Sequence, residues 1–267
     1  MTPTPLLRRR LKHALFSQLL ALCCSLAAPT AFAASVNTQW EFEIAVQPGA
    51  PTPDAASKAI VGAARLFGSV GVGSGQDRGT IDKNGYTIES RIVGSALIST
   101  IFDNLDIVRK SKGRFVNGIA LTMQYSDRRG RSQELTTATN LAAKRYEFAK
   151  GGKPTGTTAL TVAASDLASA PYAFLGKPAP LKPTFLAFND GKSIRQSTLQ
   201  PYPESVKVNG KVINAVRLAG NTTAGPLELW IRAEDGYPIR LRVGLGAAYG
   251  ATLDQRAKDI PAGLILF

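Results

Sequence analysis

The sequence predicts a mainly β protein: a single antiparallel curved sheet, either a half-barrel or an open barrel, with one or two short helices packed on it. Many short segments alternate apolar and polar residues, which is the pattern of half-buried strands. Several of these segments are joined by Asn-Gly or Asp-Gly turns, which are typical of hairpins. The chain lacks the long crossovers that parallel strands require, so the sheet is expected to be antiparallel.

The N-terminal part of the sheet is the least regular in sequence. The first predicted strand, Trp40–Val46, precedes a Pro-, Gly- and Ala-rich insertion of uncertain structure over residues 48–83, in which residues 54–66 predict a short helix. The run Gly71–Gly75 lacks the spacing of a nucleotide-binding motif and is expected to be a flexible loop. Asp82–Gly85 lacks the distal Glu of a calcium loop and predicts a turn.

The middle of the chain combines strands with two predicted helices. Tyr86–Val93 is the second strand, and a helix follows over Ala96–Leu105, where apolar residues recur at helical spacing after a serine cap. A second short helix is predicted over Asp166–Leu175, ended by a glycine and a proline. Four strands are expected between the two helices, at Ile107–Phe115, Ile119–Tyr125, Ser132–Thr139 and Arg145–Ala149.

The last third of the chain predicts three hairpins, with turns at Asn189–Gly191, Asn209–Gly210 and Glu234–Gly236. The strands that these turns join are Thr184–Phe188 with Ser193–Leu199, Val206–Val208 with Val212–Leu218, and Leu227–Ala233 with Ile239–Val243.

The register of the last hairpin follows if Gly236 takes the left-handed position of a three-residue loop. One face of the hairpin is then aliphatic, and the other carries an arginine over an indole and an ion pair. The predicted pairs are Ile231–Ile239 and Leu229–Leu241 on the first face, and Trp230–Arg240 and Glu228–Arg242 on the second. The second set supplies the candidate binding residues, although a purely structural ladder fits the same pattern.

The N-terminus has the features of a cleaved secretory signal peptide over residues 1–33. A basic segment precedes an apolar run that is too short to span a bilayer comfortably. The small residues Ala31 and Ala33 predict cleavage before Ala34, and hence a periplasmic protein. Neither cysteine follows a small residue, which disfavours a lipoprotein, and the residues after the arginines fit a twin-arginine signal poorly.

Residues 34–267 contain neither histidine nor cysteine, because Cys23, Cys24 and His13 all lie in the signal segment. Their absence excludes disulfides, triads with histidine, thiol nucleophiles, and metal sites that need imidazole or thiolate. We therefore expect no cofactor, no metal and no enzymatic activity. A carboxylate-based hydrolase stays open as an alternative, because it needs only Asp and Glu.

The predicted organisation has four parts. Residues 1–33 form the signal peptide, and residues 34–83 hold the first strand and the insertion. Residues 84–256 form the antiparallel β domain, and residues 257–267 are a C-terminal tail.

The chain is strongly basic, with 32 Lys and Arg against 19 Asp and Glu. The signal segment holds four of the cations and none of the acids, so the remainder carries a formal net charge of +9. This surplus suits an anionic ligand or contact with a membrane surface. The densest basic stretches, Arg109–Arg114 and Arg128–Arg131, also fit solvated strand ends and turns.

Six stretches occur in a distinctive order: Tyr86–Ser90, Leu97–Phe102, Ser111–Phe115, Asp166–Tyr172, Phe188–Lys192 and Leu229–Arg240. Together they resemble a proteobacterial exported family known as domain of unknown function 3108, over roughly residues 84–256. The resemblance implies an envelope protein with a curved antiparallel sheet, similar to the half-barrel of lipoprotein carriers, and it implies no catalytic residues.

The sequence leaves two functions open. The first is a binding or carrier protein for a hydrophobic or anionic ligand such as a lipid, held on a concave apolar face. The second is a structural or assembly factor of the cell envelope that contacts other proteins through its sheet edges. Export argues against a nucleic-acid partner. An outer-membrane barrel is disfavoured because Pro261 and Gly263 interrupt the alternation of the last segment.

Overall fold

The computed structural model describes residues 33–46, 69–95, 106–116, 119–223, 225–244 and 251–265. The chain divides into two units, Met1–Phe32 and Ala33–Phe267, and every described residue belongs to the second. The signal peptide up to residue 32 and the helices predicted over 54–66 and 96–105 lie outside the described residues.

The described residues form one large sheet, so the predictions of a mainly β fold and a single sheet are confirmed. A short 3-10 turn, η1 (Ala170–Tyr172), interrupts the strands. The strands are β1 (Ala34–Val46), β2 (Ser69–Ile81), β3 (Gly85–Gly94), β4 (Ile107–Val116), β5 (Ile119–Arg129), β6 (Leu135–Asn140), β7 (Arg145–Lys150), β8 (Lys153–Ala159), β9 (Ser165–Asp166), β10 (Thr184–Asn189), β11 (Ile194–Val208), β12 (Lys211–Thr222), β13 (Gly225–Arg232), β14 (Pro238–Gly244) and β15 (Ala251–Ala257).

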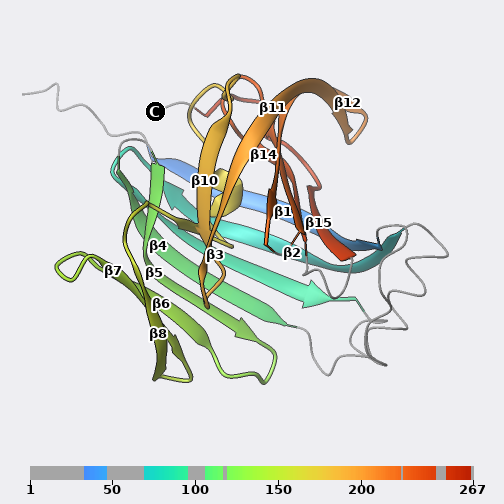
Figure 1. Ribbon diagram of the computed structural model, residues 1–267. Coiled ribbons are helices and arrows are strands. Elements are labelled where there is room, and N and C mark those ends of the chain that lie inside the picture. Colours follow the sequence, from blue (N-terminus) through green and yellow to red (C-terminus); the bar gives the residue numbers. More distant parts are fainter. Residues whose placement is uncertain are drawn as a thin grey trace, which may run out of the picture. The chain divides into compact units, whose positions relative to one another are not determined.

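The first and last strands of the sheet, β1 and β15, lie side by side near its middle. Its order is β8-β7-β6-β5-β4-β3-β2-β1-β15-β14-β13-β12-β11-β10-β9. The described part of the chain begins with β1, continues strand by strand to β8, crosses to β9 at the opposite end of the sheet, and returns to β15 beside β1 (Figure 1). Neighbouring strands are antiparallel except β9 and β10, which are parallel, so the sheet is mixed rather than purely antiparallel as predicted.

The helix predicted over Asp166–Leu175 is wrong, and the described residues contain no α-helix. The segment forms β9 and η1 instead. Asp166 Oδ1 accepts hydrogen bonds from the backbone N–H groups of Ala168 (2.9 Å) and Ser169 (3.0 Å), and such side-chain bonds compete with helical ones. Pro171 adds to this, because it has no backbone N–H to donate within a helix that begins at Asp166.

The flexible loop predicted at Gly71–Gly75 is also wrong, because these residues lie within β2. Glycine is needed in β2 because neighbouring strands come too close to leave room for a side chain. A Cβ atom on Gly79 would lie 1.9 Å from the Thr87 carbonyl oxygen of β3, and one on Gly75 would lie 2.8 Å from the Phe42 ring. The turn predicted at Asp82–Gly85 is confirmed, and it joins β2 to β3.

The predicted hairpin register is confirmed at three of its four pairs. Leu229 faces Leu241, Trp230 faces Arg240, and Glu228 faces Arg242, and Gly236 has a positive φ of 67°. The pairing of Ile231 with Ile239 is wrong. The register shifts between Trp230 and Ile231, so that Ile231 faces Pro238 and Ile239 becomes the extra residue of a bulge.

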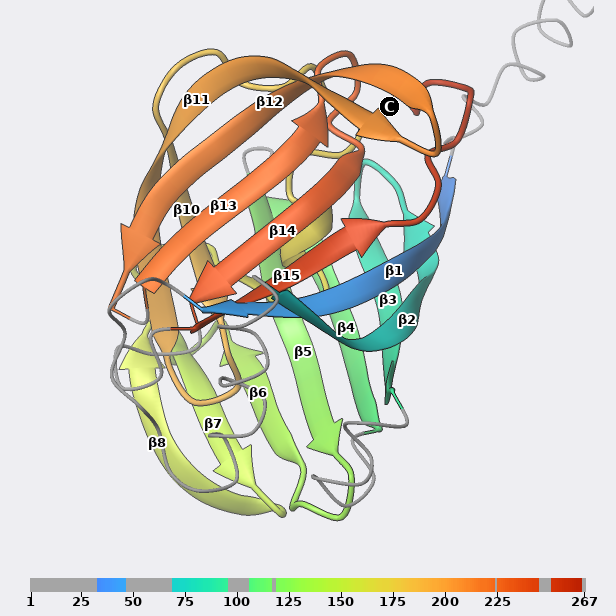
Figure 2. The same ribbon diagram turned by 90° about the vertical axis from the view of Figure 1, so that its right-hand side faces the viewer.

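The inner face of the sheet, defined here as the face that carries Trp40 and Leu229, is filled by the protein's own side chains. In β10–β15 it is largely aliphatic, whereas in β1–β7 it mixes aliphatic residues with aromatic and polar ones. Thr137 of β6 donates a hydrogen bond to Asn189 of β10 (3.2 Å), so strands far apart in the sheet order meet across this interior. Figure 2 shows β11 to β15 and β1 side by side, with their other face, the outer face, toward the viewer.

Candidate binding site

The four predicted binding residues come together on the outer face of β13 and β14. The Arg240 guanidinium carbon lies 4.5 Å from the centre of the Trp230 ring, and that of Arg242 lies 5.5 Å from it. Glu228 accepts a hydrogen bond of 2.8 Å from Arg242. Because side chains alternate along the strands, Leu227, Leu229 and Leu241 point inward, whereas these four residues point outward.

Further residues complete this arginine–aromatic ladder, and the sequence did not predict them. Arg217 of β12 donates to Glu228 at 2.8 Å, and its guanidinium lies 4.7 Å from the centre of the Tyr202 ring. The Trp230 indole N–H donates to Glu204 of β11. The sequence could have revealed these residues only through the register of β12 with β13, which places Arg217 opposite Trp230.

Asp254 of β15 is the buried acidic centre of the ladder. Its carboxylate accepts hydrogen bonds from Arg240 and Arg256, and Arg242 lies 3.5 Å away. Burial raises the pKa of Asp254, but the hydrogen bonds and charges of Arg240 and Arg256 outweigh burial and hold the pKa below 3.8. The charged groups of the ladder therefore pair with one another. Trp230, at its centre, is only 5% exposed.

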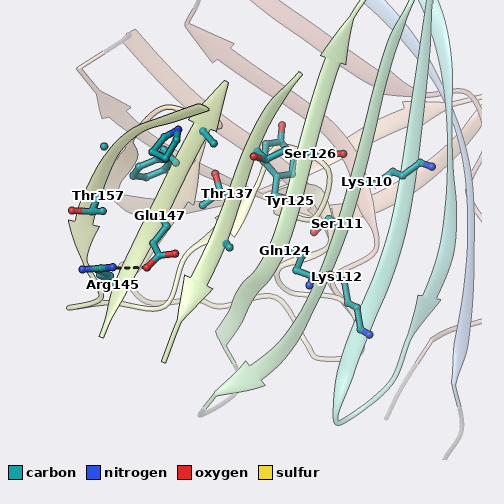
Figure 3. Close-up of a pocket in the computed structure, with 16 residues that line it drawn as sticks. Lys110, Ser111, Lys112, Gln124, Tyr125, Ser126, Thr137, Arg145, Glu147 and Thr157 are labelled. Atoms are coloured by element: carbon teal, nitrogen blue, oxygen red, sulfur yellow. Dashed lines mark hydrogen bonds and ion pairs between the residues drawn. The ribbon is translucent and has the colours of Figure 1, made fainter. Parts of the chain in front are cut away.

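A different outer-face region, which we call the trough, lies over β4 to β8 and has a volume of about 660 Å³ (Figure 3). Strand registers align ten of its residues in two cross-strand rows, one residue from each strand. The rows are Lys110–Ser126–Thr136–Ala149–Pro154 and Lys112–Gln124–Ala138–Glu147–Thr157. Each row begins with a lysine, and six of the eight residues that follow in the two rows have short side chains, which leaves the hollow.

The trough is lined mainly by carbon atoms and has cations at its rim. Lys112 makes no ion pair within the described part of the chain, and Lys110 lies 3.9 Å from Glu89. At the other side Arg145 donates to Glu147 at 2.8 Å. This arrangement offers an apolar surface beside positive charge.

Alternation along β4 explains why only part of the basic stretch Arg109–Arg114 borders the trough. Lys110 and Lys112 point outward, whereas Arg109 points inward, is 7% exposed and lies 3.5 Å from the buried Asp127. Arg129, from the second basic stretch, also donates to Asp127 (2.7 Å). The inward cations therefore neutralise a buried acid.

A second outer-face pocket, of about 600 Å³, lies where the tip of the β11–β12 hairpin meets β14, β15 and β1. Arg240 lines it together with Lys207, Arg256 and Lys258. Two of these cations have acidic partners within reach, because Arg256 lies 3.1 Å from Glu43 and Lys258 lies 3.5 Å from Glu41.

Besides Asp127, two more acids are fully enclosed on the inner face. Asp77 accepts hydrogen bonds from the Trp40 indole (2.7 Å) and the Tyr172 hydroxyl (2.9 Å), and burial raises its pKa. Asp166 accepts from Ser111 and Thr122 as well as from backbone N–H groups, and burial likewise raises its pKa. Each carboxylate is engaged by several donors of the fold itself.

Two further findings bear on the site. Among the described residues, no group of three or more His, Cys, Asp or Glu side chains is placed to hold a metal ion. No helix in the part of the chain that the structure describes is long and apolar enough to cross a membrane.

Fold and site together define a mainly β protein with one large open sheet and a basic-rimmed trough on its outer face. Comparison with models of known protein families finds no match, and neither does comparison with curated proteins. The resemblance to the exported family named above stays a prediction.

Proposed function

We propose that the protein is a non-catalytic binding protein of the cell envelope, exported to the periplasm by its N-terminal segment, and that its half-barrel-like sheet holds a ligand in the trough. The observation that carries this proposal is the pair of cross-strand rows, in which short side chains form a carbon-lined floor beside Lys110 and Lys112. A volume of about 660 Å³ falls in the range of small-molecule sites.

The chemistry of the rim and floor favours a ligand with both an anionic group and an apolar part, such as a lipid. The ammonium groups of two lysines attract an anion, and the methyl groups of Thr136, Ala138 and Ala149 accept an acyl chain. The trough replaces the concave inner face as the proposed site, because side chains of the protein itself fill that face.

Asp77 and Asp166 are not candidates for a general acid or base. A general acid or base must reach its substrate, yet Asp77 and Asp166 are at most 1% exposed and are held by donors of the fold.

Native mass spectrometry of protein purified from the periplasm, combined with lipid extraction of the same sample, tests the proposal. A reproducible bound mass of lipid size is expected, and it should be lost when Lys110 and Lys112 are both changed to Ala. Lys211→Ala, which removes an exposed lysine at the distant β11–β12 turn, is the matched control. A clean unliganded mass that persists after incubation with envelope lipids would overturn the proposal.

The second candidate, an assembly factor that acts through protein contacts, is favoured by a separate observation: one end of the sheet is an exposed edge strand, β8.

A further inference from the structure

The two edge strands of the sheet, β8 and β9, differ in how far they are buried. At one end, both residues of β9 are buried, and Asp166 is hydrogen-bonded to Ser111 of β4 and Thr122 of β5. At the other end, all seven residues of β8 are exposed, and β8 pairs only with β7. Only the β8 end therefore offers strand backbone to a partner.

The protection that edge strands normally carry is confined to the start of β8. Proteins guard such edges with lysine, proline, bulges or a covering element. Lys153 and Pro154 begin the strand, and the register shift between Phe148 and Ala149 leaves the next residue, Thr155, as the extra residue of a bulge. The remaining four residues, Gly156–Ala159, contain no charge and no proline and lie in regular register with β7.

These four residues are suited to main-chain pairing. Two of them are threonines, which favour extended structure, and Gly156 has open space where a side chain would lie. An extended segment laid along the free side of β8 would gain main-chain hydrogen bonds.

The charges around the edge indicate the chemistry of the partner. Lys144, Lys150 and Lys153 are exposed and make no ion pair within the described ranges, while the nearby Glu147 is paired with Arg145. The edge is thus net positive and complementary to an acidic segment.

A second copy of the chain fits the edge less well. Antiparallel pairing of two β8 strands centred on Gly156 would place Lys153 of each copy beside Ala159 of the other, and Ala159 is itself the partner of Arg145 in β7. Like charges would approach, on chains whose formal net charge is already strongly positive.

We propose that β8 is a docking strand that takes an extended, acidic segment of another protein by strand addition. This surface uses the backbone of β8, whereas the trough uses outer-face side chains of β4 to β8. The inference therefore goes beyond the ligand proposed for the trough and can fail or succeed independently of it.

The test uses the full chain and an N-acetylated, C-amidated peptide of the same length as β8 that alternates glutamate with valine and threonine. Binding should slow hydrogen exchange at backbone amides of β8 and should weaken as salt is raised. A peptide with lysine in place of glutamate should fail to bind.

Two controls separate main-chain pairing from charge attraction. Two N-methylated peptides are compared, each methylated at every second nitrogen, one set being the complement of the other. Methylation of the set that faces β8 should abolish binding, and methylation of the set that faces away should not, because a paired strand uses every second N–H. Thr157→Glu should weaken binding of the acidic peptide by about fivefold, since it adds a like charge beside the edge. Val212→Glu, at the exposed β12 position, should leave binding unchanged.

Three results would overturn the proposal: no protection of β8 on adding the peptide, equal effects of methylating either set of nitrogens, or equal binding of the lysine peptide. Protection of β8 that rises with protein concentration in the absence of peptide would also overturn it, in favour of self-pairing.

Discussion

Two outer-face regions of this sheet gather cations but use them in different ways. In the arginine–aromatic ladder, Arg217, Arg240 and Arg242 stack on Trp230 and pair with the half-buried Glu228 or the buried Asp254. In the trough, Lys110 and Lys112 border a hollow and have at most a distant acidic neighbour. Positive charge alone therefore does not identify a ligand site; what counts is whether the fold already supplies the counter-charge.

The residue types fit this difference. Arginine is planar, stacks on aromatic rings and bonds carboxylates with a fork of donors, so it suits a fixed cross-strand network. Lysine is a flexible point charge that stays hydrated until a ligand displaces water. The comparison predicts that ladder substitutions lower stability and spare ligand binding, whereas trough substitutions do the opposite.

The largest expected effect is at Asp254, the acidic centre of the ladder. Asp254→Ala leaves Arg240 and its neighbours without their buried counter-charge, and we expect the free energy of unfolding to fall by about 3 kcal/mol. Urea unfolding at neutral pH measures the change. Glu147→Ala, at the trough rim, is the control, and equal losses from the two variants would contradict the comparison.

The pH dependence of stability should have opposite signs at Asp254 and Asp166. The folded-state pKa of Asp254 lies below 3.8, so its contribution is complete above that pH and is lost as the pH falls through the lower value. Burial raises the folded-state pKa of Asp166, so its contribution is complete below pH 3.8 and is lost as the pH rises through the folded value.

Unfolding curves recorded from about pH 3 to 7 on wild type, Asp254→Asn and Asp166→Asn measure these signs. The stability advantage of wild type over Asp254→Asn should shrink toward the acid end. Its advantage over Asp166→Asn should shrink toward neutral pH instead. Parallel curves for the two variants would refute the assigned directions.

A smaller loss is expected from Arg240→Lys. The charge is kept, but the stacked plane over Trp230 and the two-pronged bond to Asp254 are lost, which should cost about 1 kcal/mol of unfolding free energy. Ligand binding in the trough should not change. Thermal unfolding compared with Arg78→Lys, outside the ladder, checks that the effect is specific to Arg240.

The smallest effect on stability should come from the trough. Ala138→Trp places a large ring over an exposed floor position, and we expect the free energy of unfolding to change by no more than about 0.5 kcal/mol. A larger loss in a chemical unfolding series would mean that Ala138 is part of the packed structure rather than of an open surface.

The β13–β14 part of the ladder could be predicted from the sequence because its pairs lie in one local hairpin. Gly236 fixes a three-residue turn, and once the turn is fixed, alternation sets Trp230 opposite Arg240 and Glu228 opposite Arg242. The sequence did not predict the bulge at Ile239, because a bulge depends on how the turn packs rather than on the alternation of apolar residues.

The trough could not be predicted in the same way. Its rows need the registers of four successive strand pairs, and an error of one residue in any of them moves a side chain to the other face. The basic stretch around Lys110 was visible, but its division into inward Arg109 and outward lysines depends on the face that β4 buries. Likewise, the buried bond between Tyr172 and Asp77 joins residues 95 positions apart, which no local pattern reveals.

The central claim is that the trough is a ligand site, and titration calorimetry with dodecyl phosphate, an anionic single-chain amphiphile, tests it most directly. Wild type should bind, Val212→Trp should bind equally well because that change lies on the distant and exposed tip of β12, and Ala138→Trp should lose at least about tenfold in affinity by filling the floor. Equal binding by Ala138→Trp and wild type, with both variants folded, would contradict the claim.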